Sequence, residues 1–209
     1  MKLFNITEGW LQVAVLMAFS GLVFLMSWPA MWQPGTYVVG SGGDAWQTMW
    51  RFEHKERLLT DALREGQTVP FLKEEFFGGG EARLINLSVW PWMPLHTLFG
   101  EPLGYNLVWF LSFVLSGYAM YLLVRALLHT FSETTQHVEM AAFLAGIYYM
   151  FLPYHVAQSF GHFGAMQLQW LPFIVLVGWR FWQRPTFWKA LGLALLIIVQ
   201  GWTEHHYML

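Results

Sequence analysis

The segment Leu103–Val124, with the sequence LGYNLVWFLSFVLSGYAMYLLV, contains 22 consecutive residues and no Asp, Glu, Lys or Arg. A helix needs about 20 predominantly apolar residues to cross the hydrocarbon core of a bilayer. Arg125 follows the segment directly and closes it. The segment therefore predicts a membrane-spanning helix and indicates an all-α membrane protein.

The composition of the whole chain favours the same class. Hydrophobic residues make up 56% of the chain, aromatic residues 19% and charged residues only 11%, whereas soluble domains carry about 25% charged residues. The 13 Trp and 8 Tyr residues suit the membrane–water interface. A formal net charge of −2 argues against nucleic acid as a partner. The absence of Cys excludes disulfides and Cys-ligated metals.

Four further apolar segments accompany the first. They are Trp10–Trp32, Ala141–Leu152, Gly164–Gly178 and Trp188–Trp202. We therefore expect about five spans in a single transmembrane domain, residues 1–209. The last three segments are short for a full span and need tilt or flanking aromatic residues. The first ends in SWPAMWQPG rather than in a small-residue cleavage site, which favours a retained anchor over a signal peptide.

Residues 33–102 form a long loop that we expect to face water. Thirteen of the 24 charged residues lie between Asp44 and Glu81. Apolar residues within this loop recur at helical spacing: Trp46, Met49, Trp50, Leu58, Leu59, Ala62 and Leu63. This pattern predicts an amphipathic helix on the membrane surface, or else an ordinary amphipathic helix packed on protein.

The apolar segment 84–99 near the end of this loop differs from the predicted spans. Pro91 and Pro94 interrupt it, and prolines in a helix interior disfavour a straight helix. We predict an interfacial or re-entrant segment that is buried against protein.

The basic residues of the short loops predict the orientation. Short cytoplasmic loops of membrane proteins carry an excess of Lys and Arg. With five spans and an inward N-terminus, all the short-loop basic residues fall in the cytoplasm: Lys2, Arg125, Arg180, Arg184 and Lys189. The same count places Asp44 and the loop from Pro153 to Phe163 together on the outer side.

Asp44 is the first candidate for chemistry, in the sequence SGGD just before the predicted amphipathic helix. A carboxylate held at the membrane surface can act as a general base, or orient a metal or a substrate hydroxyl. An Asp at this place is also a common helix N-cap. The two roles are compatible.

The uncharged stretch Pro153–Trp170, PYHVAQSFGHFGAMQLQW, supplies the second group of candidates. His155 and His162 suit a metal pair, a pair of substrate contacts, or interfacial residues with structural partners; zinc would need a third ligand. Tyr154 and Gln158 share this stretch, and Gln side chains suit either sugar hydroxyls or hydrogen bonds inside the bundle.

A polar cluster follows the last apolar segment. It consists of Glu204, His205 and His206. Ionisable residues next to membrane spans are costly and often functional, so we add Glu204 and His205 to the expected substrate contacts.

Three stretches together carry a family resemblance. They are GDAWQTMW at 43–50, GEPLGYNLVWFLSFVLSGYAMYLLVRAL at 100–127, and AGIYYMFLPYHVAQSFGHFGAMQLQWLPF at 145–173. Their order resembles the N-terminal half of a family of bacterial polytopic membrane proteins that are similar to GT-C-type glycosyltransferases. The resemblance covers nearly all of the chain.

The resemblance implies a polyprenyl-phosphate-linked sugar donor in the bacterial inner membrane. The sugar would move, on the non-cytoplasmic side, to a lipid, glycan or protein acceptor. An acidic residue in the first outer loop carries the acid/base or metal role in GT-C enzymes, and Asp44 matches by position. A bound Mg²⁺ or Mn²⁺ ion at Asp44 would be consistent with this role.

The chain also departs from the GT-C pattern. GT-C proteins usually have eight or more spans, so we expect this chain to be truncated relative to its relatives. Many have paired acidic residues in the first loop, whereas Ala45 follows Asp44; Glu53, Glu74 and Glu75 are the candidates for a second acid. A non-catalytic scaffold or accessory subunit, with other membrane proteins as partners, is therefore the alternative. Half of a transporter is disfavoured because no internal repeat is visible.

Overall fold

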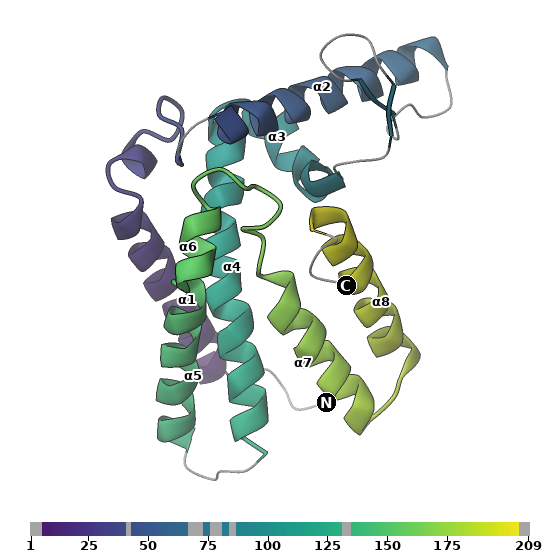
Figure 1. Cartoon of the computed structure of the whole chain (residues 1–209). Helices are drawn as coiled ribbons and strands as arrows, with labels where there is room; N and C mark the ends of the chain where they lie inside the picture. The colour runs from purple at the N-terminus through teal and green to yellow at the C-terminus, as the bar shows by residue number, and fades with distance from the viewer. Residues whose placement is uncertain are drawn as a thin grey trace.

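The computed structural model describes residues 6–40, 43–66, 73–75, 81–83, 87–130 and 135–204. The described part is helical apart from one short antiparallel hairpin (Figure 1). The elements in chain order are α1 (Ile6–Met26), η1 (Ala30–Trp32), α2 (Gly43–Glu65), β1 (Lys73–Glu75), β2 (Glu81–Arg83), η3 (Leu87–Trp92), α3 (Met93–Phe99), α4 (Leu103–Leu128), α5 (Thr135–Met150), α6 (Pro153–Gln158), α7 (Trp170–Gln183) and α8 (Phe187–Thr203).

Three helical segments are long and apolar enough to cross a membrane. They are Gly9–Met26, Leu103–Leu128 and Gln136–Gln158, and the second has the highest mean hydropathy, 2.0. The prediction of an all-α protein with membrane-spanning helices is confirmed at this level. The fourth and fifth expected spans correspond to α7 and α8, which have 14 and 17 residues. Both are shorter than the roughly 20 residues of a full span, so the count of five stays a prediction.

The central helix of the bundle is α4. It contacts α1, α3, α5 and α7, and its buried face runs from Gly104 to Leu123. The crossing with α5 is especially close, because a Cβ atom at Gly146 would lie 2.7 Å from the carbonyl oxygen of Gly117 and 2.6 Å from the Phe19 ring. Small residues allow helix backbones to approach one another in this way.

The segment with two prolines does not form a straight spanning helix, as predicted. Pro91 lies inside the 3₁₀ helix η3, and Pro94 occupies the first turn of the seven-residue helix α3. Met93 and His96 of α3 are buried, and α3 packs against α4. The segment therefore caps the bundle from one end.

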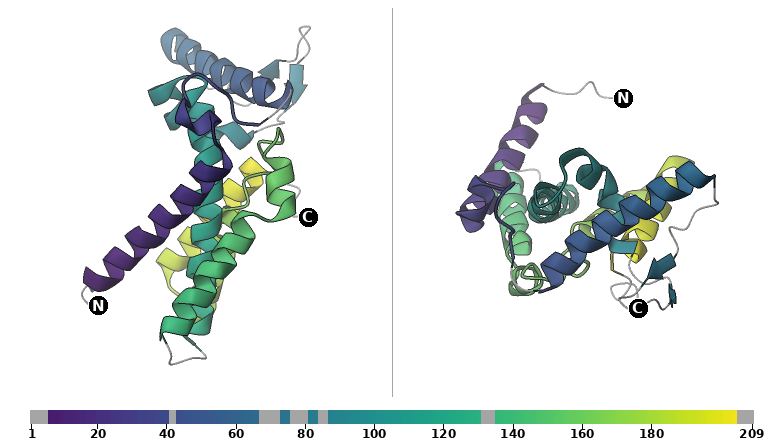
Figure 2. Two further views of the ribbon diagram at one scale, coloured as in Figure 1. Left: turned by 90° about the vertical axis from the view of Figure 1, so that its left-hand side faces the viewer. Right: turned by 90° about the horizontal axis from the view of Figure 1, so that it is seen from above.

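The amphipathic helix predicted in the long loop is α2, which lies across the end of the bundle (Figures 1 and 2). Its face toward α3 and η3 carries buried Met49 and Phe52, whereas Trp46 and Leu63 are exposed. We call this end of the molecule the α2 end. The C-terminus of α4, the N-terminus of α5 and the α7–α8 connection lie at the other end (Figure 1), which we call the opposite end. Of the five short-loop basic residues, the described ones lie there, in or near the last turns of α4 and α7 and the first turn of α8.

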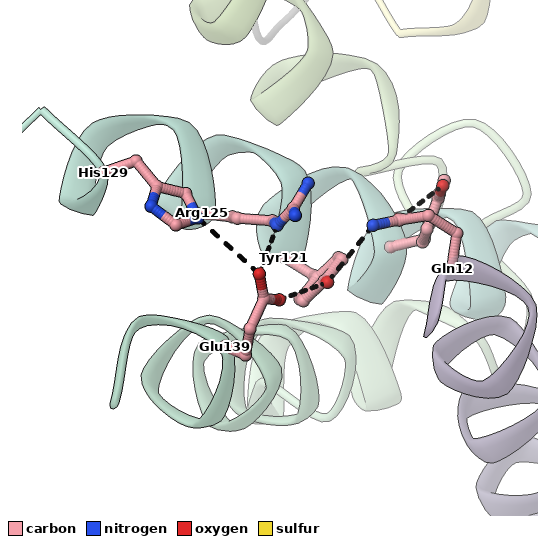
Figure 3. A network of polar contacts seen from close by, with 6 residues as sticks. Gln12, Tyr121, Arg125, His129 and Glu139 are labelled. Carbon is pink, nitrogen blue, oxygen red and sulfur yellow. Dashed lines mark hydrogen bonds and ion pairs between the residues drawn. The ribbon is translucent and has the colours of Figure 1, made fainter. Parts of the chain in front are cut away.

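A polar network at the opposite end joins α1, α4 and α5 (Figure 3). Glu139 of α5 accepts hydrogen bonds from the Tyr121 hydroxyl at 2.6 Å and from Nε of Arg125, and Nε2 of His129 lies 3.6 Å away. Gln12 of α1 donates to the Tyr121 hydroxyl at 3.4 Å. The single carboxylate is therefore surrounded by donors and ties α5 to α4, and α1 joins the network through the Tyr121 hydroxyl.

Candidate functional site

The loop 159–169 at the α2 end is held on the bundle by its own polar residues. The Ser112 hydroxyl contacts the Met166 carbonyl oxygen at 2.9 Å and Oε1 of Gln169 at 3.0 Å. Gln167 accepts a hydrogen bond from the Trp92 indole and donates one to the Phe163 carbonyl at 3.2 Å. Gln167 and Gln169 are thus used inside the bundle and fix the course of the loop.

Asn106, in the first turn of α4, fixes a second loop, residues 34–40. Its side-chain oxygen accepts from the Val39 backbone N–H at 2.9 Å, and its amide donates to the Pro34 and Tyr37 carbonyls at 2.6 Å each. This loop then meets the first one, because a Cβ atom at Gly40 would lie 3.2 Å from the Ser159 carbonyl oxygen. Gly40 also has a φ of +102°, which favours glycine.

The two loops bring Asp44 and His162 together, although these residues lie far apart in the sequence. Nε2 of His162 lies 3.8 Å from Oδ2 of Asp44. The side chains are 66% and 57% exposed. Asp44 lies within the first turn of α2 rather than before it, where the positive end of the helix dipole favours a negative charge.

The neighbouring aromatic residues anchor this pair. The ring of Phe163 packs edge-on against Phe52 of α2 at 5.6 Å and lies tilted against Tyr105 of α4 at 5.8 Å. The His162 backbone N–H donates to the Gln158 carbonyl at 2.9 Å. A fixed backbone therefore presents an imidazole and a carboxylate to solvent, where the pair can exchange a proton or bind a polar ligand.

A second titratable cluster, which the sequence analysis missed, lies beneath α2. His96 is buried and stacks on Phe52 at 5.1 Å. Its Nδ1 lies 2.9 Å from Oε2 of Glu56, and its Nε2 lies 3.4 Å from Oε1 of Glu101. These residues come from α2, α3 and the turn between α3 and α4, and they follow no motif spacing. The one available signal was that His96 is a polar residue in an otherwise apolar segment.

Within this cluster, the carboxyl group of Glu101 has a raised pKa. Its pKa is raised from 4.5 to about 7, chiefly by burial; a hydrogen bond from the Tyr105 backbone N–H lowers the pKa in part, and the nearby Glu53 charge adds a smaller increase. Its side chain is 22% exposed. Glu101 is therefore a carboxyl group that changes charge near neutral pH at the edge of the α2 end.

The other expected substrate contacts lie in different surroundings. His155 is completely buried, with Nδ1 2.8 Å from the Met150 carbonyl oxygen and its ring stacked on Phe113 at 4.0 Å. This burial leaves no surface for a substrate, so we correct the expectation and assign His155 to packing. Tyr154 is exposed and Gln158 is partly exposed, both on α6.

Glu204 ends α8 beside the loop that carries His162. A Cβ atom at Gly164 would lie 2.9 Å from Oε2 of Glu204. His205 and His206 lie outside the described residues. Of the candidate second acids, Glu53 pairs with Arg57, and Glu74 and Glu75 lie in β1.

Within the ranges that the structure describes, no group of three or more His, Asp or Glu residues is placed to hold a metal ion. A cation at Asp44 would thus have one protein carboxylate, and its remaining ligands would be substrate oxygens and water, an arrangement that Mg²⁺ commonly adopts.

Comparison of the chain with models of protein families, with curated proteins and with solved structures finds no match.

Proposed function

We propose that this chain is a GT-C-type glycosyltransferase, or the N-terminal half of one, in the bacterial inner membrane. It would transfer a sugar from a polyprenyl-phosphate donor to an acceptor on the non-cytoplasmic side. The observation that carries the proposal is the pairing of Asp44 with His162 at 3.8 Å on the end of a membrane bundle, beside a surface helix.

The proposed chemistry assigns one role to each side chain of the pair. Asp44 accepts the proton of the acceptor hydroxyl as that oxygen forms a bond to the anomeric carbon. The bond from this carbon to the donor phosphate breaks, and polyprenyl phosphate leaves with the negative charge. His162 contacts the phosphate, where donors are most effective because charge develops there. A divalent cation, when bound, would neutralise the same phosphate.

The surroundings of the pair support a lipid substrate. Trp28, Trp32 and Tyr37 are exposed near the α1–α2 connection, Trp46 is exposed on α2, and Phe160 is exposed two residues before His162. Aromatic side chains of this kind suit the boundary between headgroups and acyl chains. A lipid phosphate at this depth would lie level with Asp44 and His162.

The proposed topology has five spans and a cytoplasmic N-terminus. Two observations support it: the segment with Pro91 and Pro94 does not span as a straight helix, and the described short-loop basic residues gather at the opposite end. Tyr154, Gln158 and Glu204 would extend the substrate surface around the pair. His205 is included on its sequence position alone.

The direct test is Asp44→Asn in the purified chain, reconstituted with polyprenyl-phosphate-linked sugars extracted from bacterial membranes. Release of polyprenyl phosphate is followed by mass spectrometry. We expect at least about a hundredfold loss of turnover, the usual contribution of a general base. Asp61→Asn, an exposed carboxylate farther along α2, is the matched control. Full turnover by Asp44→Asn would remove Asp44 from the mechanism.

One observation favours a non-catalytic scaffold as the second candidate. The residue after Asp44 is Ala45, which is buried, so the first turn of α2 offers no second carboxylate. A scaffold would bind polyprenyl phosphate without turnover in the unmodified chain. An open reading frame that continues past Leu209 into further spans would favour the enzyme.

A further inference from the structure

The turn between α7 and α8 contains basic residues, and residues 140–203 contain no acidic residue that could balance their charge. Between Glu139 and Glu204, the only Asp, Glu, Lys or Arg residues are Arg180, Arg184 and Lys189. All three lie within one turn, residues 180–189, which we call the α7–α8 turn. This turn belongs to the opposite end of the molecule, away from Asp44 (Figure 1).

Lys189 holds the α7–α8 turn in shape. Its ammonium group donates to the carbonyl oxygen of Arg180 at 2.9 Å and to that of Arg184 at 2.7 Å. Carbonyl groups at a helix C-terminus lack partners within the helix, and a cation there is favourable. The charge of Lys189 is therefore used within the turn, and the two arginine backbones are fixed.

The arginine side chains, by contrast, face outward. Arg180 and Arg184 are exposed, and within the described part of the chain neither guanidinium has an ion-pair partner. Guanidinium groups bind phosphate oxygens in a bidentate manner. The turn thus offers two exposed guanidiniums, without ion-pair partners among the described residues, on a backbone that Lys189 holds in place.

Apolar side chains surround these two arginines. Trp182, Phe187 and Trp188 are 85%, 71% and 76% exposed. An exposed stripe continues from the turn along one face of α8, at spacings of three and four residues: Trp188, Leu191, Leu195, Ile198 and Trp202. Such a stripe is the face of a helix that contacts an apolar phase.

We infer that the α7–α8 turn is a binding site for an anionic phospholipid. The Arg180 and Arg184 guanidiniums bind the headgroup phosphate, the aromatic rings lie at the headgroup boundary, and an acyl chain follows the stripe on α8. Cations at one end of a continuous apolar stripe match an anionic amphiphile. A nucleic acid would need more cations, and an acidic peptide would not cover the stripe. This inference does not depend on the proposed glycosyl transfer.

The test compares lipid retention by the full chain in native mass spectrometry. The purified protein is titrated with phosphatidylglycerol and with phosphatidylcholine, and the preference is the ratio of the two apparent affinities. Each arginine near a membrane surface contributes about 1 kcal/mol, so Arg180→Gln and Arg184→Gln should each reduce the preference roughly fivefold. Arg64→Gln removes the same charge from an exposed site on α2 and should leave the preference unchanged.

Three results would overturn the inference. The unmodified chain could retain both lipids equally, or Arg64→Gln could reduce the preference as much as the turn variants do. The third concerns folding: Arg180→Lys keeps the charge, although it loses the bidentate geometry, and should therefore keep more of the preference than Arg180→Gln does. A loss as large as that of Arg180→Gln would indicate a disturbed turn rather than a missing charge.

Discussion

The two ends of the bundle use their carboxylates in opposite ways. At the opposite end, Glu139 is bonded to Tyr121 and Arg125, with His129 close by (Figure 3). At the α2 end, Asp44 meets one exposed imidazole at 3.8 Å. Glu139 lies in a candidate span, where a charge must be paired, whereas Asp44 is open to water. The first arrangement serves stability, and the second leaves a carboxylate available for chemistry.

The largest expected effect is on Glu139. Glu139→Ala leaves Arg125 partly buried without its partner, and breaking such a pair costs about 3 kcal/mol of unfolding free energy. Denaturant unfolding in detergent micelles measures it. The double variant Glu139→Ala with Arg125→Met should recover a large part of the loss. A change below about 0.5 kcal/mol in the single variant would contradict the structural role of this end.

Asn106 comes next, because it fixes the loop that leads into α2. Asn106→Ala leaves the buried Val39 N–H without an acceptor, which costs about 2 kcal/mol. It should also lower any activity that depends on Asp44, because the loop that positions α2 is released. Asn106→Asp keeps the acceptor but sets a buried carboxylate against the Pro34 and Tyr37 carbonyl oxygens, so it should lose at least as much stability as Asn106→Ala. A smaller loss in Asn106→Asp would show that the acceptor, not the amide donors, holds the loop.

The third prediction concerns pH and Glu101. Its pKa is raised from 4.5 to about 7 in the folded protein, so folding favours the neutral carboxyl. Stability from this group is fully present below pH 4.5 and is lost as the pH rises toward 7. The difference between these pKa values corresponds to about 3 kcal/mol, and solvent screening of this partly exposed side chain reduces the effect. We therefore expect a decrease of about 2 kcal/mol across this window, measured by thermal unfolding at a series of pH values. In Glu101→Gln the stability should depend less on pH in the same window. An unchanged pH dependence in this variant would exclude Glu101 as its source.

The smallest expected effect is that of Asp44 on stability. Exposed ion pairs contribute about 0 to 1 kcal/mol, so Asp44→Ala should change the unfolding free energy by less than about 0.5 kcal/mol. Thermal unfolding in the same micelles checks this beside Glu139→Ala. Equal destabilisation by the two variants would contradict the conclusion that Glu139 stabilises the fold and Asp44 does not.

The spanning helix at Leu103–Val124, the surface helix α2 and the break at Pro91 and Pro94 were all predictable. Each follows from local composition, helical periodicity or proline chemistry. The shared location of Asp44 and His162 followed from the distribution of short-loop basic residues, which predicts sidedness.

The contacts inside the bundle were not predictable in the same way. A membrane interior and a lipid face are equally apolar, so nothing local distinguished buried His155 from exposed His162. The cluster of Glu56, His96 and Glu101 joins three elements whose relative placement depends on tertiary packing. Glu56 and Glu101 are ordinary charged residues of the long loop, and His96 is an ionisable residue in an apolar segment, so none of the three indicated the other two.

The close crossing of Gly117 and Gly146 has a mechanical consequence. Backbone atoms of α4 and α5 and the ring of Phe19 from α1 meet there with no room for a methyl group. The helices α1, α4 and α5 are therefore held at a fixed spacing by the absence of side chains at this crossing, and a methyl group at Gly146 would have to push them apart.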